Sequence, residues 1–357
     1  MWSERSWEQG DPNTSDDAPQ YGMIRSRVPA SRDGTHTGSQ TACDAGICQR
    51  GHALPGSMRI NVTPLANSVD AITQRRHETM SYKTILVHVN DKRRAEALLE
   101  PAIYLANQYN SHLIGMHVYA SVPAPPIAIP YASRMLGGVV AADRKETEEI
   151  EAIFSRMTAN HPFGAEWRAR KVPHLDLAAI VLDHGRAADL IIAGQTDPDW
   201  DLSPLMDFPE RLALEGGRPV LVIPYVGRYV EVGNNVAVAW KAVREAARAT
   251  FDALPILTRA KTVQILNIKH RGEESAALTA DSSIGAALAR HGIKPTLRTS
   301  VADDISVGEE ILSRLADQGA DLLVMGAYGH SRMREMVFGG ATRHIARHMT
   351  VPTLFSH

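Results

Sequence analysis

With 357 residues, 44% of them hydrophobic and 22% charged, the chain has the composition of a globular protein and room for two domains of ordinary size. Its formal net charge of -2 gives no reason to expect nucleic acid or an acidic membrane surface as a partner. No apolar run approaches the about 20 residues that a membrane helix needs, and the N-terminal residues lack the apolar core of a signal peptide. The two cysteines, Cys43 and Cys48, make no disulfide framework. We therefore expect a cytoplasmic protein.

Residues 1–80 are rich in polar residues, glycine and proline and show no hydrophobic period. Such a segment cannot bury enough apolar surface to offset the entropy of ordering it, so we expect it to be disordered. Met80 then opens a run that is typical of the start of a globular chain. The extension is therefore either the product of a start codon placed too far upstream or a real tail, and the sequence leaves both interpretations open.

Strands and helices are predicted to alternate through a first domain at residues 81–227. The expected strands are 83–89, 112–118, 165–171, 188–193 and 219–223, and the expected helices are 94–108, 143–159 and 175–184. The prolines between residues 122 and 130 exclude a central strand or the interior of a helix, so we expect a loop there.

The same order returns in a second domain at residues 233–357. Its expected strands are 235–239, 262–268, 294–300, 322–325 and 351–355, and its expected helices are 244–254, 276–290, 308–316 and 342–349. The run Ala188–Gly194 matches Ala320–Gly326, which indicates two copies of one domain. Alternating strands and helices predict an α/β fold with two tandem, doubly wound, mostly parallel sheets. The first copy is longer, and the segment 121–140 is the expected site of the excess.

A glycine-bearing stretch joins a strand to a helix near the C-terminus. Its glycines follow the pattern Gly326-x2-Gly329-x9-Gly339, and Gly340 comes directly after. Glycine lets a backbone approach an anion closely, and a helix N-terminus offers unbonded N–H groups and positive partial charge. The stretch therefore predicts a site for an anion such as phosphate.

This stretch resembles the nucleotide-binding motif of the universal stress protein family. The flanking runs ADLLVMG and VPTLF, and the opening strands TILVHV and VAVAW with the helices after them, are similar to those of the family as well. The resemblance covers roughly residues 81–357 and implies two five-stranded domains of the adenine nucleotide alpha hydrolase-like, Rossmann-like kind. It also implies ATP or AMP as a ligand. The final strand is expected to form a homodimer or to pair the two domains of one chain.

The resemblance further implies a set of site residues in the second domain. Gly326 and Gly329 would shape the loop beside the ribose and phosphates, and Gly339 with the helix N-terminus would receive phosphate oxygens. The complete expected set is Gly326, Gly329, His330, Arg332, Gly339, Gly340, Ala341, Thr342 and Lys241. Gly340 departs from the family pattern, which has Ser or Thr there, and so does Lys241, where the family tends to have Asp. A lysine removes an acceptor for the nucleoside but can reach a phosphate as a point charge.

The first domain has lost the glycine loop. After Gly194 its sequence is QTDPDWDLSPLMDF, and the acidic side chains there would repel phosphate. These acidic residues are Asp197, Asp199, Asp201, Asp207 and Glu210. We therefore expect no nucleotide in this half, and a cation or another ligand fits it better.

Three histidines could have a chemical role, one as a base and two as zinc ligands. His330 lies in the glycine loop, where a base could act, but an exposed loop histidine is more often only polar. His344 and His348 have the spacing of a zinc pair, but they lie beside arginines and lack an acidic third ligand, so a solvated helix end is favoured. We predict no metal site and no catalytic residue.

The predicted function is nucleotide binding or sensing in a stress response, without catalysis, because no nucleophile with an adjacent base is present in the motif. Three alternatives stay open. The first is a non-nucleotide interaction scaffold, which Lys241 and Gly340 favour. The second is a slow ATP hydrolase that uses His330, and the third is a carrier of a metal or small ligand that uses the acidic loop of the first domain.

Overall fold

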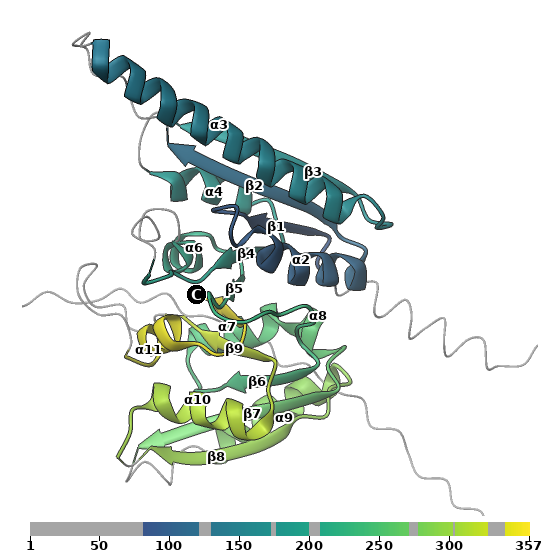
Figure 1. Ribbon diagram of the computed structural model, residues 1–357. Coiled ribbons are helices and arrows are strands. Elements are labelled where there is room, and N and C mark those ends of the chain that lie inside the picture. Colours follow the sequence, from purple (N-terminus) through teal and green to yellow (C-terminus); the bar gives the residue numbers. More distant parts are fainter. Residues whose placement is uncertain are drawn as a thin grey trace, which may run out of the picture. The chain divides into compact units, whose positions relative to one another are not determined.

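The computed structural model describes residues 81–120, 130–172, 176–199, 208–270, 278–302, 304–327 and 340–357 (Figure 1). The extension at residues 1–80 lies outside them. All described residues belong to one structural unit, in which strands and helices alternate through two successive halves. None of the described helices is long and apolar enough to cross a membrane.

The first half is built from strands joined by helices, as its apolar periodicity predicts. In chain order its elements are β1 (Thr84–His88), α2 (Ala95–Tyr109), β2 (His112–Ala120), α3 (Pro130–Thr158), β3 (Ala165–Val172), α4 (Leu177–Gly185), β4 (Leu190–Gly194), α6 (Pro209–Glu215) and β5 (Val220–Ile223).

The second half repeats this order. Its elements are β6 (Asn235–Ala239), α7 (Arg244–Asp252), α8 (Leu254–Leu257), β7 (Thr262–His270), α9 (Leu278–Arg290), β8 (Thr296–Ala302), α10 (Val307–Gln318), β9 (Leu322–Gly326), α11 (Gly340–His348) and β10 (Thr353–Ser356).

The strands of both halves form one ten-stranded sheet in the order β3-β2-β1-β4-β5-β10-β9-β6-β7-β8. The pairs are parallel except for β5 with β10, which run antiparallel with Leu221 opposite Leu354. We call this antiparallel pair the seam. Each half thus has its first strand in the middle and its last strand at the seam, and the two last strands pair within one chain.

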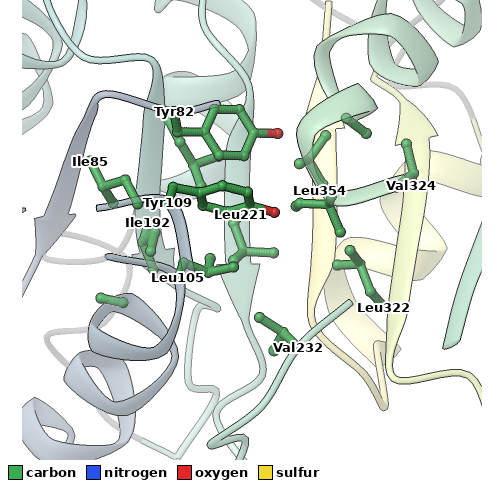
Figure 2. Packing of buried hydrophobic residues seen from close by; sticks show 14 of the residues in the cluster. Tyr82, Ile85, Leu105, Tyr109, Ile192, Leu221, Val232, Leu322, Val324 and Leu354 are labelled. Atoms are coloured by element: carbon green, nitrogen blue, oxygen red, sulfur yellow. The ribbon is translucent and has the colours of Figure 1, made fainter. Parts of the chain in front are cut away.

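Two apolar clusters, one on each face of the sheet, continue through the seam. One is covered by α2, α3, α7, α8 and α9, and the other by α4, α6, α10 and α11. Figure 2 shows the first cluster, in which Leu221 and Leu354 lie between the apolar side chains of the two halves. Both leucines are 0% exposed. Since burying one leucine contributes about 2 kcal/mol, separating the halves would be costly.

Equivalent aspartates fix the start of the central strand in each half. Asp189 Oδ2 accepts hydrogen bonds from the backbone N–H groups of Lys83 and Thr84 at 2.8 and 3.0 Å. Asp321 accepts them from the N–H groups of residues 233, 234 and 235 at 2.9 to 3.1 Å. Charge-assisted bonds of this kind are strong. The Ala-Asp-Leu run that repeats in the sequence therefore has the same structural role in both halves.

Two helices of the first half differ from the sequence-based expectation. Helix α3 begins at Pro130, whereas its predicted start is residue 143. Proline has no N–H, and the first N–H groups of a helix make no intrahelical bond, so a proline can begin a helix as well as exclude one. Helix α6 was not predicted because it is only seven residues long and also begins with a proline, Pro209.

Candidate functional site

The carboxyl ends of β6 and β9 lie side by side at one edge of the sheet in the second half, and we call the position outside them the crevice of this half. These neighbouring parallel strands belong to crossovers that lead to opposite faces of the sheet, and such switch points are where ligands bind in open α/β folds. Ala239 pairs with Met325, so Lys241 and Gly326, which follow them, lie at the same edge of the sheet. The structure thus brings together two of the residues that the sequence proposes for one site.

Of the other residues that the sequence predicts for the site, three lie in the part of the chain that the structure describes. Gly340, Ala341 and Thr342 form the first turn of α11. Gly340 is exposed and Thr342 is buried, with 5% of its surface exposed. Gly329, His330, Arg332 and Gly339 lie outside the described residues.

Gly326 is required by packing. A Cβ at this position would lie 2.5 Å from the backbone nitrogen of Ala246 and from the carbonyl carbon of Glu245. The missing side chain therefore lets the first turn of α7 approach β9. Gly340 is different, because a Cβ there would meet no atom within 4 Å. Nothing among the described residues closes the space beside the start of α11.

Glu245, which sequence reasoning missed, lies against Gly326 at this edge of the sheet. It is 6% exposed and forms an ion pair with Arg244 at 3.0 Å. Its position in the first turn of α7 is favourable for an acidic residue, because the N-terminus of a helix carries positive partial charge. The local sequence therefore explains this glutamate by the helix dipole alone. It does not reveal that the residue contacts the end of β9.

The histidines of α11 face α10. A Cβ at Gly308 of α10 would lie 2.7 Å from His344 Cβ, so this glycine admits the histidine. The rings of His344 and His348 are 4.4 Å apart, and His348 Nδ1 lies 2.9 Å from the carbonyl oxygen of His344. Within the described residues, no group of three or more His, Cys, Asp or Glu side chains could hold a metal ion.

The corresponding crevice of the first half, at the ends of β1 and β4, is occupied by Arg94. This side chain is buried, with Nη1 donating to the carbonyl oxygen of Gln195 at 2.8 Å and Nη2 to that of Ile223 at 3.4 Å. A Cβ at Gly194 would lie 2.7 Å from Arg94 Nη2. The glycine that ends β4 thus makes room for a guanidinium of the chain itself.

The sequence around Arg94 carries a local sign that its side chain has a tertiary role. Arg94 is the N-cap residue of α2, where a cation is unfavourable to the helix dipole. Asp91 precedes it, and its Oδ1 accepts hydrogen bonds from the N–H of Arg94 at 3.1 Å and from Arg93 Nε at 3.3 Å. An arginine at a helix start, three residues after an aspartate, points to a tertiary role.

Two buried histidines flank the same crevice. His88, at the end of β1, is 1% exposed, and its ring stacks on Phe208 with 5.0 Å between the centroids. Burial lowers the pKa of His88 to about 3, and the nearby His117 adds to the effect. His117 Nδ1 lies 2.7 Å from the carbonyl oxygen of Val89. His88 is therefore a neutral core residue at physiological pH.

The acidic loop of the first half is described in part. The N–H of Asp199 donates to Asp197 Oδ1 at 3.0 Å, and both residues lie at least partly in solvent. Glu210, in the first turn of α6, has its pKa raised by burial, an effect that Arg347 opposes. Asp201 and Asp207 lie outside the described residues.

Comparison with known proteins agrees with this architecture. Residues 236–357 match the family model described as the universal stress protein family. A universal stress protein from Synechocystis is 44% identical over 46 residues, which cover 13% of this chain and only 16% of that protein.

Among solved structures, a universal stress protein from Archaeoglobus fulgidus is similar, with a TM-score of 0.57 at 14% identity over 76% of this chain and 95% of that one. A functionally unknown protein from Pseudomonas aeruginosa has a TM-score of 0.47 at 14% identity over 79% and 94% of the two chains. The second half, residues 236–357, therefore matches the universal stress protein family, and the first half repeats the same fold.

Proposed function

We propose that the second half binds an adenine nucleotide, ATP or AMP, at the carboxyl edge of β6 and β9. The observation that carries the proposal is the meeting of β6 and β9 at one edge of the sheet, in the half whose helix α11 leads back to the last strand. The first N–H groups of α11 make no intrahelical bonds and carry positive partial charge. A Cβ added at Gly340 would meet no atom of the described residues within 4 Å, which supports room for phosphate oxygens there.

Lys241 supplies a cation at the carboxyl end of β6. It follows β6 and is exposed, so its ammonium group can reach phosphate as a point charge. Phosphate is therefore attracted from the β6 side by a side chain and from the α11 side by the helix N-terminus.

We propose one nucleotide per chain. In the first half Arg94 already fills the space above Gly194 and its guanidinium donates to backbone carbonyls. The nucleotide acts as a signal and not as a substrate, and its binding in the cytoplasm changes the contacts that the protein makes with partners during stress.

Calorimetric titration of ATP and AMP into the full-length protein tests the proposal. We expect saturable binding at one site per chain, weakened at least tenfold in Gly340→Asp, because the new carboxylate would lie beside the phosphates. Ala286→Asp, an equally exposed change in the middle of α9, serves as the matched control and should leave binding intact. Absence of binding at millimolar nucleotide would contradict the proposal.

A second candidate function is an interaction scaffold that takes no nucleotide. The buried Glu245 beside Gly326 favours it, because a negative charge near the candidate site opposes a phosphate. The same titration separates the two functions, since a scaffold would show no heat of binding with either nucleotide.

A further inference from the structure

Gln195, directly after β4, joins the first half to α11 of the second half. It is 1% exposed. Its side-chain Nε2 donates to the carbonyl oxygen of Ala346 in α11 at 2.9 Å, and its Oε1 accepts from the N–H of Tyr225 at 3.1 Å. Both ends of the amide are therefore used, one within its own half and the other across the seam.

Ala346 lies in the last turn of α11, which ends at His348. The final four carbonyl groups of a helix have no intrahelical partner and must find another donor when they are buried. Ala346 is 8% exposed, so the amide of Gln195 acts as a C-terminal cap supplied by the other half. On its other side α11 packs against α10 through His344 and Gly308.

This cap has no equivalent in the first half. The residue that corresponds to Gln195 at the end of β9 is Ala327, whose N–H donates to the carbonyl oxygen of Ser356, as the N–H of Gln195 donates to that of Ile223. Alanine has no side-chain donor, so it cannot cap α6 in return. The contact is therefore a one-way support of the helix whose first turn faces the candidate nucleotide site.

We infer that Gln195 is a positioning residue for the nucleotide site, although it lies in the half that binds no nucleotide. The inference rests on the function proposed above. A helix of nine residues is a rigid rod of roughly 13 Å, so fixing its last turn against the first half sets the direction of its first turn. The N–H groups of the first turn, at Gly340, Ala341 and Thr342, are then already held in place for the ligand. Binding therefore does not have to offset the entropy of ordering this turn.

Gln195→Met tests the inference, because methionine keeps the length and volume of the side chain but removes both hydrogen bonds. We expect the amides of α11 to exchange with deuterium about threefold to tenfold faster in the ligand-free protein, and the Kd for ATP to rise by a similar factor, as loss of one buried hydrogen bond predicts. Gln195→Glu, which keeps the acceptor toward Tyr225 and loses the donor, should act in the same direction.

Tyr82→Phe is the matched control. It also removes one hydrogen bond that spans the halves, from the Tyr82 hydroxyl to the carbonyl oxygen of Asp252 at 2.8 Å. Tyr82 belongs to the apolar cluster on the opposite face of the sheet from α11. A general weakening of the seam would affect ATP binding in both variants, whereas a positioning role affects it only in the Gln195 variants. Thermal unfolding and the exchange of α4 show that each variant is folded.

Unchanged exchange of α11 in both Gln195 variants would overturn the inference, and so would faster exchange with an unchanged Kd for ATP. If the wild-type protein binds no ATP, the proposed function fails and the role of Gln195 toward nucleotide fails with it. The exchange measurement is made without ligand, so it still decides separately whether Gln195 fixes α11.

Discussion

The guanidinium of Arg94 lies directly over Gly194, where a Cβ would be only 2.7 Å from Nη2. In the second half the glycine at the same point of the fold, Gly326, is instead covered by the first turn of α7 and by Glu245. The two crevices of one chain thus carry a cation and an anion at equivalent positions. The repeat has kept its backbone and diverged in charge at the edge that holds the candidate site.

Replacing Arg94 by alanine should destabilise the protein by about 2 to 4 kcal/mol, because it leaves two buried carbonyl groups, those of Gln195 and Ile223, without this donor. Urea denaturation measures the change in the free energy of unfolding. Arg93→Ala is the matched control: its side chain is 58% exposed, and its ion pair with Asp91 should contribute less than about 1 kcal/mol. Equal losses in the two variants would refute the structural role of Arg94.

Stability should fall in mild acid because of His88. Its pKa in the folded state is lowered to about 3, below the ordinary value of 6.5 that the unfolded chain has. Below pH 6.5 the unfolded state therefore binds a proton that the folded state does not. The free energy of unfolding then falls by about 1.4 kcal/mol for each further pH unit, until the pH reaches the pKa of the folded state. Urea denaturation at pH 7 and pH 5 should show a loss of roughly 2 kcal/mol from this residue.

His88→Leu should remove this part of the pH dependence. Among the described residues Nε2 of His88 has no hydrogen-bond partner, so leucine sacrifices no bond there and fits the apolar surroundings of β1. A His88→Leu variant that is as acid-sensitive as the wild type would show that the loss comes from other groups.

The strands and most helices could be predicted from the sequence because their signal is local. Apolar residues recur along each element, and the run from Ala188 to Gly194 repeats at Ala320 to Gly326. The contacts of Arg94, Glu245 and Gln195 could not be found this way, since each depends on a partner brought close only by the folded sheet. Gln195 and Ala346, for example, are 151 residues apart in the chain. Composition and periodicity carry no information on such pairs.

Lys241 should contribute to phosphate binding through charge alone. Lys241→Ala is expected to weaken ATP about threefold to tenfold and to leave adenosine binding nearly unchanged, with the difference from wild type shrinking as salt is added. Titrations of ATP and adenosine at low and high ionic strength measure both effects. Lys294→Ala, which removes an exposed lysine at the amino edge of β8, should change neither. Equal weakening of ATP and adenosine would instead place Lys241 beside the nucleoside.

Gly340→Ser should strengthen nucleotide binding. A Cβ at this position meets no atom within 4 Å, so the side chain can be added without strain, and its hydroxyl would lie in the first turn of α11. A hydrogen bond from this hydroxyl to a charged phosphate is expected to lower the Kd for ATP by about tenfold. Gly340→Ala adds the Cβ without the hydroxyl and separates the new hydrogen bond from better helix propensity. If the serine and alanine variants bind ATP equally well, the phosphates do not lie at the start of α11.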